Sequence, residues 1–112
     1  MKKAFVFHAK EMDLLGKAKE FEPFKFNLVA IVDLEEEVTG SGVHNELEFA
    51  FKVTNHIDSE WMLNATVHPV VYGLVRSTSV GDVVMIGNES YLCASADWKK
   101  IPMKSHAHNY YD

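Results

Sequence analysis

The stretch FKFNLVAIVD, residues 24–33, has the alternation of a β-strand and is the strongest structural signal in the chain. Phe26 and Leu28 alternate with polar neighbours, and a period of two residues is that of a strand. Val29 and Ile31 are apolar on the opposite face, so we expect the middle of the strand to be covered on both faces. Such a strand lies in the interior of a sheet.

Upstream of this strand, the sequence predicts another strand and a helix. Residues 4–7 form a short apolar run that is typical of an edge strand. In residues 10–21, Leu14, Ala18 and Phe21 recur at helical spacing. Proline then ends the expected helix.

A second helix is predicted over residues 46–55. Asn45 followed by Glu48 fits a capping box, in which two side chains satisfy free amide groups at a helix start. Glu46 adds favourable negative charge there, and apolar side chains on more than one face indicate a core helix. The acidic and glycine-containing residues 33–42 before it are expected to form a loop.

The second half of the chain predicts more strands. Residues 70–75 have the composition of a strand, and residues 83–86 with 91–94 predict a hairpin around the turn 87–90. We therefore expect one α+β domain over residues 1–112, a small antiparallel β-sheet with one or two packed helices. The C-terminal tail from about residue 104 is expected to be flexible.

The segment RSTSVGD, residues 76–82, is interpreted as a turn that leads into the hairpin. Gly81 is expected to adopt backbone angles that other residues avoid, and Asp82 or a serine hydroxyl to hold a loop amide. A serine nucleophile would need a neighbouring base and an oxyanion site, and neither is visible in the sequence around Ser79. A structural turn is therefore favoured over a catalytic one.

Composition narrows the class of protein. The chain has 112 residues, of which 47% are hydrophobic and 24% charged, as in an ordinary globular domain. The net charge of -5 argues against a surface that grips phosphates. The single cysteine excludes an internal disulfide, and no stretch has the length of a membrane helix or a signal-peptide core. We expect a soluble protein in the cytoplasm.

Residues 55–61 are the most site-like stretch. Asn55, His56 and Asp58 crowd hydrogen-bonding side chains next to the large ring of Trp61. One interpretation is a helix cap in which the indole fills the core; another is a surface that binds a protein partner, since Trp is a favoured interface anchor. Acid–base catalysis by His56 with Asp58 is a third.

Arg76, Ser77 and Ser79 are candidates for the same partner-binding surface, because Arg is a second favoured anchor of interfaces. A small hydrolase that uses Cys93 or Ser79 with a histidine is a lesser alternative.

A metal site is not expected. His106 and His108 would share one face if the tail were a strand, but the rest of a tetrahedral ligand set is not apparent. Cys93, His56 and His68 are scattered singly along the chain. We expect neither a metal nor a cofactor.

The order of STSVGDVV (residues 77–84), YLC (91–93) and WKKI (98–101) resembles the C-terminal part of YodL-like domains. Those domains occur in bacterial mobile elements, and similar segments occur in uncharacterised small phage proteins. The resemblance covers roughly residues 46–101. It implies a phage or mobile-element setting, but it implies no established activity and no catalytic residues.

The leading functional hypothesis is a small accessory protein that is not an enzyme and binds a host or phage protein. It would do so through residues 55–61 and the turn at residues 76–82. The alternative is a nucleic-acid-binding small β-barrel, because the VGDVV strand entry at residues 80–84 resembles part of PUA-like RNA-binding barrels.

Overall fold

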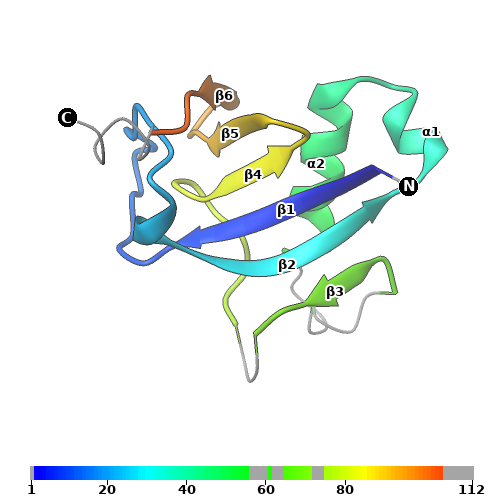
Figure 1. Ribbon diagram of the computed structural model, residues 1–112, viewed down its shortest axis with the longest axis horizontal. Helices are drawn as coiled ribbons and strands as arrows, with labels where there is room; N and C mark the ends of the chain where they lie inside the picture. The colour runs from blue at the N-terminus through cyan, green and yellow to red at the C-terminus, as the bar shows by residue number, and fades with distance from the viewer. Residues whose placement is uncertain (1, 56–60, 62–64, 72–74, 105–112) are drawn as a thin grey trace, which may run out of the picture.

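The computed structural model describes residues 2–55, 61, 65–71 and 75–104. Within these residues, six strands form one antiparallel sheet with the order β3-β2-β1-β4-β5-β6 (Figure 1). The strands are β1 (Lys2–Ala9), β2 (Phe26–Leu34), β3 (Val67–Pro69), β4 (Val83–Ile86), β5 (Glu89–Cys93) and β6 (Trp98–Ile101). The sheet is open, with β3 and β6 at its two edges.

Helices complete the expected α+β fold, which the structure confirms. The short α1 (Glu36–Thr39) leads into α2 (Val43–Val53), and both lie at the end of the sheet where β2 finishes (Figure 1). Leu47, Ala50 and Val53 of α2 pack in the main core cluster against β1, β2 and β4. Among the described helices, none is both long and apolar enough to cross a membrane.

β2 is the interior strand that the sequence predicts. It lies between β1 and β3, and it begins at Phe26 because the preceding residues form the 3₁₀ turn η1 (Pro23–Lys25). Its register with β1 shifts between Val6 and Phe7, a β-bulge opposite which Val29 and Ala30 are both buried.

The two faces of the sheet have separate cores. One face packs against α2, and the other carries a smaller cluster centred on Phe21, which is fully buried. The Phe21 ring meets the edges of Phe7 and Phe26 with centroid distances of 5.0 and 5.1 Å. This second core covers the start of β2 at Phe26. Leu28 and Ile31, in the middle of the strand, are only half-buried, so the expectation that the middle of β2 is covered on both faces is met only in part.

The helix predicted over residues 10–21 is wrong. The Asp13 carboxylate accepts hydrogen bonds from the Lys17 and Ala18 amides, and Gly16 has a φ of 59°, so a tight loop replaces the helix. Leu14 is 68% exposed while Phe21 is buried, so residues spaced for one helical face point to different surroundings.

Two strand predictions are also wrong. β1 is an interior strand of eight residues, not a short edge strand, because β2 and β4 pair with it on either side. Residues 70, 71 and 75 are not in a strand, and residues 72–74 lie outside the described residues; β3 instead pairs earlier with β2. Val71 and Val75 instead pack against the main core, which explains their apolar character.

The second helix exists but begins three residues before the predicted start. Its N-cap is Gly42, without a side-chain cap, so the capping box is wrong; the Asn45 amide instead donates to the Ser41 carbonyl. Glu46 is 1% exposed and lies 3.1 Å from the Lys2 ammonium, so it joins helix to sheet rather than facing solvent. The loop predicted before this helix contains α1.

The hairpin and its entry turn are confirmed. β4 and β5 pair around a tight turn, with β5 starting two residues earlier than predicted. Gly81 has a φ of 96°, and its amide donates to the Cys93 carbonyl at 2.8 Å. The expected tail lies mostly at residues 105–112, outside the described residues.

Replacing Gly81 with alanine should destabilise the protein by about 2–4 kcal/mol. A Cβ atom there would lie 2.5 Å from the Asp13 carbonyl oxygen, in addition to the strain of a positive φ. Gly87→Ala is the matched control, because its φ is also positive but nothing lies within 4 Å of the added carbon. Urea unfolding should show a loss of only about 1 kcal/mol for the control; equal losses would contradict the packing argument.

Candidate functional site

A buried ion pair organises the turn before β4. Asp82 is 1% exposed, and the Arg76 guanidinium donates to its two carboxylate oxygens at 2.6 and 2.8 Å. Arg76 Nη1 also donates to the Ser77 carbonyl at 3.0 Å. This paired geometry holds the guanidinium in one orientation, with about a third of the side chain exposed.

The same carboxylate binds two backbone amides. The Ala9 amide, at the end of β1, donates to Asp82 at 2.9 Å, and the Ser79 amide donates at 2.8 Å. The sequence-based expectation that Asp82 holds a loop amide is therefore confirmed. One buried carboxylate thus joins β1, the turn and Arg76.

A chain of side-chain hydrogen bonds runs beneath the turn. His8 Nε2 lies 2.9 Å from Thr78 Oγ1, which lies 2.7 Å from Thr54 Oγ1. Thr54 Oγ1 must donate its hydrogen to the Ala50 carbonyl at 2.7 Å, so Thr78 donates to Thr54 and His8 donates to Thr78. His8 therefore carries a proton on Nε2.

Asn55 and Trp61 dock the turn onto the end of α2. The Asn55 amide donates to the Thr78 carbonyl at 2.8 Å. The Trp61 indole is 3% exposed and donates to the carbonyls of Val75 and Arg76 at 3.2 and 3.1 Å. Its ring also meets the His8 ring edge to face at 6.4 Å.

Of the predicted site residues, the structure brings five together: Asn55, Trp61, Arg76, Ser77 and Ser79. His56 and Asp58 lie outside the described residues. The polar groups of Asn55 and Trp61 are engaged within the chain, which supports the helix-cap and core-filling interpretation of these two residues. His8, Thr54 and Thr78 were missed, because their partners lie 24 to 70 residues away in the sequence.

Burial lowers the pKa of His8 to about 4, and the Arg76 cation acts in the same direction against the opposing Asp82 anion. The imidazole therefore stays neutral at physiological pH. A general base would need to reach a substrate, whereas Nε2 here donates to a threonine that is fully buried. The cluster is a structural network.

The hydrolase alternative gains no support from the geometry. Burial raises the pKa of the Cys93 thiol to about 11, so little of the reactive thiolate form exists at neutral pH. The Ser79 hydroxyl lies 3.5 Å from the Arg76 guanidinium, which cannot act as a base.

A groove of about 420 Å³ runs beside the exposed edge of Arg76. Its floor and walls come from the end of β1, the start of β2 and the segment before the turn. No acidic residue is among its described lining residues, although acidic side chains outnumber basic ones 16 to 11 in the chain. The lining comprises His8, Ala9, Lys10, Asn27, Leu28, Val29, Val71, Val75 and Arg76.

Within the described residues, no group of three or more His, Cys, Asp or Glu side chains is placed to hold a metal ion. His68 instead contacts Asp33 at 2.8 Å on the surface. His106 and His108 lie outside the described residues.

Comparison of the chain with protein-family models, with curated proteins and with solved structures finds no match. The resemblance to YodL-like domains accordingly stays a prediction.

Replacing Asp82 with alanine should lower the free energy of unfolding by about 3–5 kcal/mol, because Arg76 and two amides lose a buried acceptor. Glu89→Ala is the control: its ion pair with Lys100 is 3.2 Å long but exposed, and its loss should cost less than about 0.5 kcal/mol. Chemical denaturation of both variants measures the difference. Similar costs would show that the buried pair does not hold the turn.

His8 should make the stability depend on pH. Between its ordinary pKa of 6.5 and about 4, the unfolded chain binds a proton that the folded protein does not. The stabilisation is therefore full above pH 6.5 and is lost as the pH falls towards 4, by at most about 3 kcal/mol. Urea unfolding from pH 4.5 to 7.5 should show a weaker pH dependence for His8→Gln than for the exposed control His44→Gln; parallel profiles would contradict the assignment.

Proposed function

We propose that this protein is a non-enzymatic accessory protein that binds a protein partner beside the Arg76 turn. The observation that carries the proposal is the groove, which combines apolar walls with Lys10 and Arg76 and has no described acidic lining residue. Such a groove suits an extended segment with apolar and acidic side chains. The network of interactions around Asp82 supports this role by holding Arg76 in one orientation before binding.

The binding surface in this proposal differs in detail from residues 55–61. Asn55 and Trp61 support the turn from below, and Arg76, Ser77 and Ser79 form its outer side. The partner would contact the second set, together with the start of β2 near Leu28.

The biological setting rests on the sequence alone. The resemblance of residues 77–84 to YodL-like domains supports a phage or mobile-element origin. The partner would then be a host or phage protein, and the protein would act in the cytoplasm of the host cell.

Capture from bacterial lysate tests the proposal with the full chain and a groove variant, Lys10→Glu with Leu28→Ser. A specific partner should bind the variant about tenfold more weakly, or worse, while it binds the α2 surface control Lys52→Glu normally. Quantitative mass spectrometry at low and high salt provides the measurement. Equal capture by all three proteins contradicts the groove, and capture abolished by nuclease indicates the nucleic-acid alternative.

A further inference from the structure

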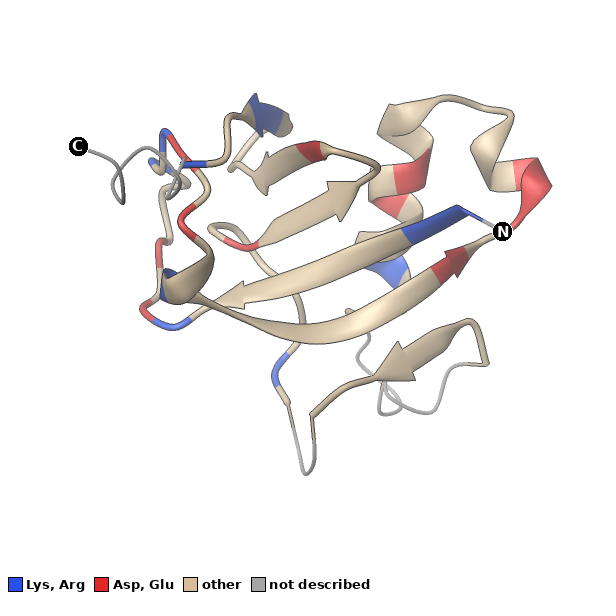
Figure 2. Cartoon of the chain, viewed as in Figure 1, with Lys and Arg blue, Asp and Glu red and all other residues tan. Residues whose placement is uncertain are grey.

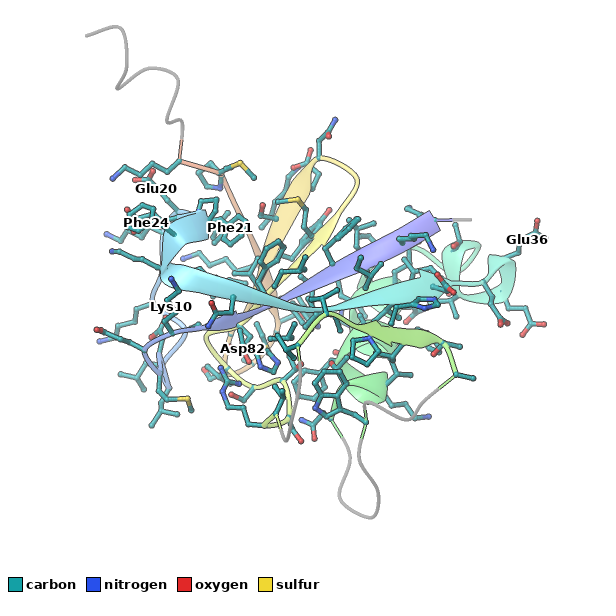
Figure 3. All side chains as sticks on the ribbon, turned by 60° about the horizontal axis from the view of Figure 1, so that its bottom comes forward. Lys10, Glu20, Phe21, Phe24, Glu36 and Asp82 are labelled. Atoms are coloured by element: carbon teal, nitrogen blue, oxygen red, sulfur yellow. The ribbon has the colours of Figure 1, made fainter. Side chains whose placement is uncertain are left out.

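Five of the seven large hydrophobic side chains that are exposed in the described residues gather at one end of the molecule. We name this surface the apolar end; its members, 49% to 68% exposed, are Met12, Leu14, Leu15, Phe24 and Met103. Four belong to the segment between β1 and β2, and Met103 pairs with Phe21 of that segment. Figure 3 shows Phe24 and Phe21 at this end, far from Glu36.

The apolar end has both a hollow and a projection. A cleft of about 600 Å³ is lined by Met12 and Phe24, with Ala9 and Gly81 among the residues at the strand ends. Leu14 and Leu15 lie outside the lining and are 68% and 64% exposed. The apolar end thus carries two exposed leucines and a cleft whose lining combines Met12 and Phe24 with charged side chains.

The rim of the cleft has mixed charge. Lysines and glutamates alternate along the segment between β1 and β2, and both signs are visible there in Figure 2. The Asp13 carboxylate is engaged by the Lys17 and Ala18 amides. Glu22 is engaged by Lys25 at 2.7 Å and by Lys104 at 3.0 Å. The other charged lining residues are Lys10 and Lys19 with Glu11 and Glu20.

This mixture of charges distinguishes between the kinds of partner that could cover the apolar end. Nucleic acid or an anionic membrane would meet three glutamates around the apolar residues, which repel phosphate. A two-fold symmetric contact instead presents the same surface twice, so that each lysine can face a glutamate of the other copy. Mixed charge around a projection and a hollow is self-complementary.

We propose that the apolar end is the contact surface between two copies of this chain. Leu14 and Leu15 of each copy enter the cleft of the other, against Met12 and Phe24. The lysines and glutamates of the two rims pair around this apolar centre, as in the polar rim of a protein interface. The dimer buries the five exposed hydrophobic side chains of the apolar end.

This inference does not depend on the proposed partner groove. The groove and the cleft share Ala9 and Lys10, but neither Leu14 nor Leu15 lines the groove. Substitutions at the two leucines therefore test the dimer and leave the groove lining intact.

Sedimentation of the full chain over a range of concentrations tests the proposal. The wild type should form a dimer, and Leu14→Asp with Leu15→Asp should raise the dimer Kd at least about tenfold. Val43→Asp is the matched control, because Val43 is 41% exposed on α2 and should leave the Kd unchanged. Circular dichroism confirms that all three proteins fold.

Charge reversal provides a second measurement. Lys10→Glu with Lys19→Glu makes the rim acidic, and Glu11→Lys with Glu20→Lys makes it basic, so each variant alone should dimerise more weakly than wild type. An equimolar mixture should restore dimers, because the two reversed rims are complementary. A mixture that dimerises no better than either variant overturns the symmetric arrangement.

Four other results would overturn the proposal. The first three are a wild type that stays monomeric up to about 1 mM, a dimer that the leucine variant leaves unchanged, and a monomer that binds phosphatidylcholine vesicles through the two leucines. The fourth is a wild-type monomer that dimerises after Tyr110→Ser with Tyr111→Ser. This result would show that the C-terminal residues of the same chain cover the apolar end.

Discussion

The buried carboxylate of Asp82 is the constraint on which the arrangement of this fold depends. It accepts hydrogen bonds from Arg76 and from the amides of Ala9 and Ser79, so the end of β1 meets a turn that is far from it in the sequence. A charge that is 1% exposed is tolerated only where donors surround it. The turn therefore has one low-energy position relative to the sheet.

That position determines the neighbouring surfaces on both sides of the turn. On one side, Gly81 packs so closely on Asp13 that a Cβ atom would not fit, which holds the loop between β1 and β2 against the turn. On the other side, Thr78 connects the turn through Thr54 to the end of α2. The groove and the cleft both border residues that these contacts fix, since Arg76 lines the first and Gly81 the second.

Local signals in the sequence predicted part of this structure correctly. The alternation around Leu28 identifies β2, and the turn residues identify the hairpin and the role of Asp82. The helix predicted around Leu14 fails because Asp13 offers its carboxylate to amides that a helix would have used. A helical spacing of apolar residues could not reveal this competition.

Long-range pairing lies beyond such signals. The interior position of β1 follows from its pairing with β4, about 80 residues later, and His8 appears as an ordinary strand residue until Thr78 is placed beside it. For the same reason, the sequence identifies Trp61 and Arg76 as candidate site residues but does not separate their roles. Trp61 supports the turn from inside the protein, whereas Arg76 is partly exposed on its surface.

The distribution of charge explains how one small acidic chain can present two different surfaces. Acidic residues make up much of α1, as Figure 2 shows, and mixed charge surrounds the apolar end, whereas the described lining of the groove holds only basic charge. Asp82 allows this separation because it neutralises Arg76 from the buried side and leaves no carboxylate at the groove surface. An exposed acid in the same position would pair with Arg76 equally well, but it would also repel an acidic segment. In the proposed function, burial of the counter-ion would thus favour an acidic segment in the groove.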